Sequence, residues 1–101
     1  MDITLISATE ASEAIRAGRM TSEELVGACL ERIAAMEDRI GAWAHLDADH
    51  ALKQACEADR IQRDGQTMGP LHGIPVGVKD IFDTKDMPTE DGTVLHAGRQ
   101  P

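Results

Sequence analysis

Apolar residues recur at helical spacing through the first two-thirds of the chain. Ser7-Ala8-Thr9-Glu10 and Thr21-Ser22-Glu23-Glu24 each match a capping box, in which a hydroxyl and a glutamate satisfy the free N–H groups of a first helical turn. The first box predicts a short helix through about Ala17, stopped by Gly18. The second predicts a longer helix that ends before Gly41, with an apolar face made of Leu25, Val26, Cys29, Leu30, Ile33 and Met36. We expect this face to be core; the alternative is a groove for a partner helix.

A third helix is predicted from near Asp47 to Arg63, after a short extended segment at Trp43 to Leu46. Asp64-Gly65 is expected to terminate it. The residues expected to face inward are Ala48, Ala51, Leu52, Ala55 and Ile61. From Gly69-Pro70 onward helical periodicity vanishes and Gly and Pro recur every few residues, which is typical of loops and short strands.

The clearest predicted strand runs from Ile74 to Asp80. Side chains alternate between the two faces of a strand, so one face carries Ile74, Val76 and Val78 and suits a core. The other face carries Pro75, Gly77 and Lys79, and its lack of bulk allows a backbone or a ligand to approach closely. Burial disfavours the charged form of a lysine, so a buried lysine there could serve as a base. The alternative is a solvated lysine at a strand end, as most lysines are.

Composition narrows the class of protein. A chain of 101 residues fits one small domain, and only Trp43 and Phe82 are aromatic. The net charge of −8, with ten basic residues scattered among eighteen acidic ones, disfavours nucleic acid and anionic membranes as partners. We interpret the acidity as a solubility feature. The N-terminus has neither the basic region nor the apolar run of a signal peptide, so a cytoplasmic location is expected.

Metal and cofactor sites are not expected. The four histidines lack ligand spacing, the two cysteines lie far apart, and no cofactor motif is present; these residues are His45, His50, His72, His96, Cys29 and Cys56. The glycines before Lys79 do not form a phosphate-binding loop, since Val78 separates Gly77 from the lysine. We expect His72 to be a loop residue rather than a base, and Asp80 to hold its loop through hydrogen bonds from backbone N–H groups.

The run G-P-L-H-G-I-P-V-G-V-K-D-I-F-D-T from Gly69 to Thr84, followed by M-P-T-E-D-G-T from Met87 to Thr93, resembles the amidase signature family around its catalytic lysine. The resemblance extends over the preceding helices and so covers essentially the whole chain. It implies a Ser–cis-Ser–Lys triad, in which a serine attacks an amide carbonyl and the lysine moves protons through a second serine. Only Lys79 can be carried over, because the family's two serines and its oxyanion loop follow later in its chain. Ser7, Ser12 and Ser22 stand at helix starts or in a first turn, where capping explains them.

The resemblance implies an α/β fold in which residues 1–101 form the N-terminal part of a single amidase domain. Residues 1–65 would be helical, and residues 69–101 would hold the catalytic-lysine strand and loops, the first strands of a mixed sheet. The implied activity is hydrolysis of the carbon–nitrogen bond of a small carboxamide, with no cofactor and with this fragment inactive by itself. One alternative is a non-catalytic fragment. Another alternative is that the chain is part of the amidase subunit of a tRNA-dependent amidotransferase. We rank it below the general amidases, because K-D-I-F-D-T from Lys79 to Thr84 looks closer to theirs. Expected partners are the amide substrate and either a second copy or the remainder of the amidase domain.

Overall fold

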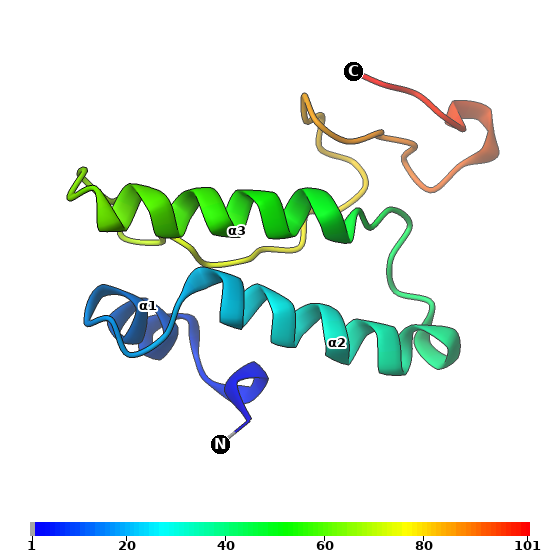
Figure 1. Ribbon diagram of the computed structural model, residues 1–101. Helices are drawn as coiled ribbons and strands as arrows, with labels where there is room; N and C mark the ends of the chain where they lie inside the picture. The colour runs from blue at the N-terminus through cyan, green and yellow to red at the C-terminus, as the bar shows by residue number, and fades with distance from the viewer. Residues whose placement is uncertain (1) are drawn as a thin grey trace.

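The computed structural model describes residues 2–101, and the regular elements found there are all helical. Three α-helices follow one another, and a short 3-10 turn stands near each end of the chain. Their bounds are η1 Ile3–Leu5, α1 Ala8–Arg16, α2 Ser22–Ile40, α3 Ala48–Arg63 and η2 Val94–His96. Helices α2 and α3 lie side by side and antiparallel, with α1 beside the C-terminal end of α3 (Figure 1).

The helix boundaries confirm the capping predictions. Ser7 and Thr21 are the N-caps of α1 and α2, and their hydroxyls accept hydrogen bonds from the N–H groups of Glu10 and Glu24. Asp47 caps α3 in the same way. Helix α2 ends at Ile40 and is capped by Gly41, whose φ of 61° suits a residue without a side chain. The termini of all three helices could therefore be read from local sequence alone.

The core is small and lies where η1, α1 and the start of α2 meet. Its fully buried apolar members are Ala11, Ile15, Met20 and Leu25. Cys29 and Ile74 are partly buried against it. On α3 only Ala55 of the predicted inward residues is fully buried, whereas Ala48 is exposed. The predicted α2 face is buried at its N-terminal end and only half-buried from Cys29 onward.

The predicted α/β fold is wrong for this chain. Residues 2–101 contain no strand, and the stretch predicted as one, Ile74 to Asp80, follows an irregular path without a paired backbone. A strand exists only when a neighbouring backbone completes its hydrogen bonds, and none of the described residues does so. Ile74 does reach the core, but Val76 and Val78 are 72% and 44% exposed. The predicted apolar strand face is thus uncovered beyond its first residue.

The chain leaves a group of large apolar side chains in solvent around this stretch. Leu71, Val76, Val78, Ile81 and Phe82 are all at least 44% exposed. Exposed apolar groups this close together favour association. We expect the isolated chain to self-associate, with a sedimentation-derived mass that rises between micromolar and millimolar concentration. A monomer that unfolds cooperatively across that range would contradict this expectation.

Candidate functional site

The segment that leads to Lys79 is tied to the helices by its backbone carbonyls. We call residues 69–79 the strap; it runs along α3 and passes between the helices (yellow in Figure 1). Arg16 donates to the carbonyl of Gly69 at 2.6 Å, and the Ser12 hydroxyl donates to the carbonyl of Pro70 at 2.8 Å. The Ser22 hydroxyl donates to the carbonyl of Gly73 at 2.7 Å. Side chains of α1 and α2 therefore fix the first half of the strap.

These bonds correct the interpretation of the serines. Capping accounts for Ser7, but Ser12 and Ser22 use their hydroxyls to hold the strap. The backbone N–H of Ser22 is bound instead by the carboxylate of Asp59 on α3, at 2.8 Å. All three serine hydroxyls are thus engaged in structural contacts, and none is presented as a nucleophile.

His72 adds a fourth attachment, from the strap to α3. Its Nε2 lies 2.8 Å from the carbonyl oxygen of Ala58, and since a carbonyl only accepts, the proton is on Nε2. The side chain is half-buried. His72 therefore acts as a loop residue, as expected, and its bond to α3 commits its Nε2 proton to structure rather than to proton transfer at Lys79.

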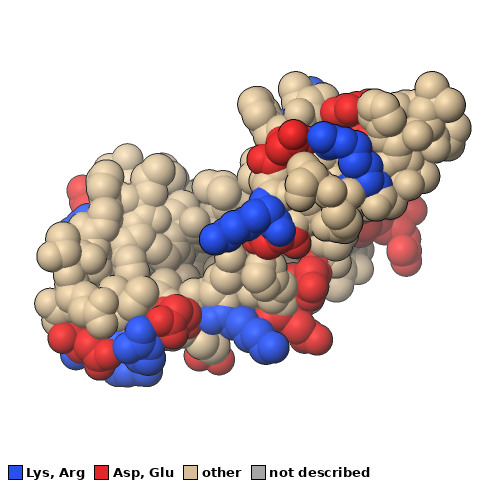
Figure 2. All heavy atoms as spheres, turned by 90° about the horizontal axis from the view of Figure 1, so that it is seen from above, with Lys and Arg blue, Asp and Glu red and all other residues tan. Residues whose placement is uncertain are grey.

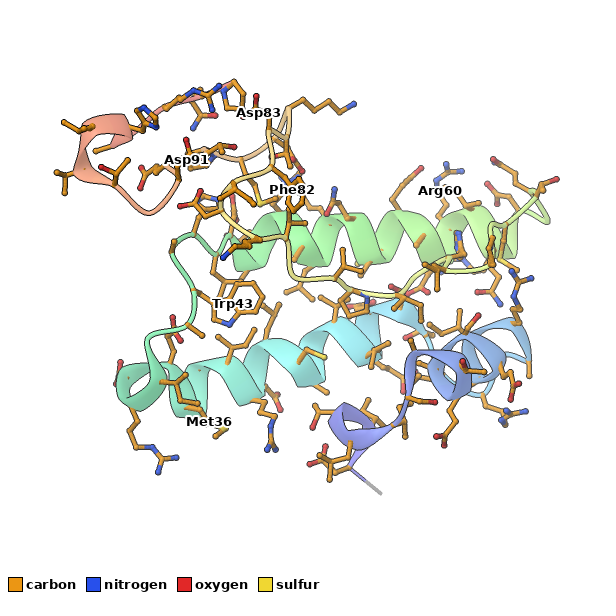
Figure 3. The ribbon with its side chains drawn as sticks, turned by 180° about the vertical axis from the view of Figure 1, so that it is seen from behind. Met36, Trp43, Arg60, Phe82, Asp83 and Asp91 are labelled. Atoms are coloured by element: carbon orange, nitrogen blue, oxygen red, sulfur yellow. The ribbon has the colours of Figure 1, made fainter. Side chains whose placement is uncertain are left out.

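Two glycines of the strap make close contacts. Gly73 has a φ of 79°, and a Cβ at this position would lie 3.1 Å from the Cβ of Ser22. A Cβ at Gly77 would lie 3.3 Å from Cη2 of the Trp43 ring. A backbone or a ligand was expected to approach the small-residue face; at Gly77 the neighbour is instead the aromatic side chain of Trp43. Figure 3 shows Trp43 between α2 and α3.

Lys79 itself stands at the end of the strap with an exposed side chain. Its carbonyl accepts hydrogen bonds from the N–H groups of Ile81 and Phe82, at 2.8 and 3.2 Å, which turns the chain directly after it. Among residues 2–101, its ammonium takes part in none of the hydrogen bonds or ion pairs found. The expected burial of this amine is not provided by the described residues, and its catalytic role stays a prediction.

Asp80 holds the loop that follows, as predicted. Its Oδ1 accepts the N–H of Glu90 at 2.8 Å, ten residues further on. Thr89, only 1% exposed, donates its hydroxyl to the carbonyl of Phe82, and its own N–H donates to the carbonyl of Arg99. These bonds close residues 80–99 into a separate loop beyond the N-terminal end of α3 (Figure 1).

This loop should loosen in acid. Hydrogen bonds from Arg99 lower the pKa of Asp83 from its ordinary 3.8, and a hydrogen bond from His50 lowers the pKa of Asp86. A carboxylate whose pKa is lower in the folded chain stabilises the fold above its unfolded pKa, and this stabilisation is lost as the pH falls through the lowered value. We expect the amide protection factor of Thr89 to drop below about pH 4. An Arg99→Ala variant should show low protection at every pH.

Metal-ligand clusters and membrane-spanning helices are not found in residues 2–101, the described part of the chain. No group of three or more His, Cys, Asp or Glu side chains there could hold a metal ion, and no helix there is long and apolar enough to cross a membrane. Basic and acidic side chains are interspersed on the face shown in Figure 2. On α3, Arg60 pairs with both Glu57 and Asp64.

Comparison with known proteins places these features in context. The family model described as Amidase matches residues 24–101. Curated relatives include glutamyl-tRNA(Gln) amidotransferase subunits from Chloroflexus aggregans, Salinispora arenicola and Chloroflexus aurantiacus. They are 41%, 39% and 43% identical over 99%, 99% and 95% of this chain. The aligned region is 20% of each relative, so the chain spans about a fifth of their length.

Proposed function

This chain belongs to the amidase family, and on that premise we propose that Lys79 is the base of an enzyme that cleaves the carbon–nitrogen bond of a carboxamide. The observation that carries the proposal is the placement of Lys79. It ends a strap that is held to α1, α2 and α3 through several side chains, and its own amine is committed to no structural contact found in residues 2–101.

Cleavage of an amide by the proposed triad requires free serine hydroxyls, and residues 2–101 do not offer them. A Ser–cis-Ser–Lys triad needs serine hydroxyls that a base can activate, and Ser7, Ser12 and Ser22 are engaged elsewhere. We therefore propose that both serines of a Ser–cis-Ser–Lys triad come from polypeptide outside residues 1–101, and that this polypeptide covers Val76 and Val78 and encloses Lys79. Residues 1–101 would then be the N-terminal part of one amidase domain.

Two finer activities fit this proposal. The names of the curated relatives favour an amidotransferase-type role, in which ammonia released from a carboxamide is passed to an acceptor bound elsewhere. The K-D-I-F-D-T sequence from Lys79 to Thr84 favours a general amidase that releases ammonia to solvent. The relatives resemble this chain over nearly its whole length, so we rank the amidotransferase-type role first, reversing the order suggested by the short motif.

Ammonia release tests the proposal and separates the two activities. The complete enzyme, with residues 1–101 joined to the polypeptide that carries the serines, is given glutamine, asparagine and simple aliphatic amides. Release from glutamine that increases when an aminoacyl-tRNA acceptor is added supports transfer, whereas equal release from many simple amides supports a general amidase. Failure to release ammonia from any carboxamide would reject both. Residues 1–101 alone should release none.

A further inference from the structure

The ring of Trp43 contacts the strap at Gly77, close in sequence to Lys79. The contact is made at Gly77, two residues before Lys79 along the strap. Cη2 and Cζ3 of the Trp43 ring lie 3.3 and 3.9 Å from the position that a Cβ on Gly77 would occupy. The indole therefore fills the space beside Gly77, two residues before the lysine.

The backbone that carries the ring is held in place from α2. The carboxylate of Glu37 accepts the N–H of Ala42 through Oε1 and the N–H of Trp43 through Oε2, each at 2.8 Å. Gly41 ends the helix just before this pair and allows the chain to turn back. Trp43 remains 38% exposed, so it is only partly covered by its neighbours. An aromatic side chain with a fixed backbone is a rigid surface for packing.

We propose that Trp43, held by Glu37, is a positioning residue that sets the place of Lys79 through its contact with Gly77. The proposal rests on the proposed catalytic role of Lys79. After Lys79 the chain is held by its own turn and by Asp80. Before Lys79, none of the side-chain bonds found in residues 2–101 holds a strap carbonyl beyond Gly73, so the ring contact at Gly77 is the attachment that lies closest to the lysine on this side. A displacement of the amine by about 1 Å lowers the rate of proton transfer strongly, while substrate binding by other groups is little changed.

A double-mutant cycle in the complete enzyme tests this contact. We expect Trp43→Ala and Gly77→Val each to lower kcat about tenfold or more with KM within about threefold. In the double variant the added side chain at position 77 enters the space that the ring has left. The double variant should thus be no slower than the slower single variant. Trp43→Phe, which keeps an aromatic ring, should recover most of the activity, and Leu46→Ala, another exposed apolar residue of the same linker, should stay within twofold.

The outcomes distinguish a failure of the positioning role of Trp43 from a failure of the catalytic role of Lys79. Losses that multiply in the double variant, or a Trp43→Ala enzyme with full kcat, would overturn the positioning role. Trp43 is the one tryptophan and the chain has no tyrosine, so its emission reports on this contact in residues 1–101 without any activity. Gly77→Val should shift that emission, and an unchanged spectrum would overturn the contact even if a variant of the complete enzyme failed to fold. Full activity of Lys79→Ala would instead reject the proposed function and leave the emission result standing.

Discussion

Replacing Lys79 by alanine in the complete enzyme is expected to lower kcat by about 10²- to 10⁴-fold, the range that a positioned base contributes. KM should change little, because the amine moves protons in the transition state and does not bind the ground-state amide. Lys79→Arg should be nearly as slow, since a guanidinium keeps the positive charge but does not give up its proton. This pair of variants separates a base from a positive charge that merely stabilises an anion.

Lys85→Ala is the matched control for this prediction. Lys85 is also exposed, lies six residues further on, and its loss changes the net charge by the same amount. Its kcat should remain within about twofold of the unmodified enzyme. If Lys79→Arg were as active as the unmodified enzyme, or if Lys85→Ala were as slow as Lys79→Ala, Lys79 would not be the base.

Replacing Asp59 by alanine is expected to cause the largest loss of stability. Its side chain lies on α3 and is 8% exposed, and its two oxygens accept the N–H groups of Ser22 and Glu23 at 2.8 and 3.0 Å. Thr21 caps the N–H of Glu24, so Asp59 completes the first turn of α2 from a different helix. Without the carboxylate, two N–H groups at a buried helix end lose their acceptor. The cost is about 2–4 kcal/mol, a large part of the stability of a chain of this size.

Urea unfolding of residues 1–101, followed by circular dichroism at low protein concentration, measures this loss. The unfolding free energy of Asp59→Asn should fall between those of the unmodified chain and Asp59→Ala. An amide offers one acceptor oxygen but turns its donor toward the second N–H group. Asp38→Ala removes an exposed carboxylate from α2 and should change the unfolding free energy by less than about 0.5 kcal/mol. An Asp59→Ala chain as stable as Asp38→Ala would show that the link between α2 and α3 contributes little.

The candidate site was only partly predictable. Sequence reasoning predicted the helix caps and the loop-holding role of Asp80, and the structure confirms both. The catalytic role of Lys79 stays a prediction. Sequence reasoning missed the hydroxyls of Ser12 and Ser22 as attachments of the strap, because a serine near a helix start reads equally well as a cap. It also missed the contact between Trp43 and Gly77. Two features of the sequence could have pointed to this contact: the rarity of aromatic residues, and a glycine on the face of the predicted strand that also carries the lysine.

The sequence by itself determined the three helices and their ends, since caps and apolar periodicity act within a few residues of one another. Only the tertiary structure decided how the strap is held, because its carbonyl partners lie more than fifty residues away along the chain at Ser12, Arg16 and Ser22. It also decided that Ile74 to Asp80 is not a strand here. A strand depends on a second backbone, and alternation along one segment does not reveal whether that backbone is present.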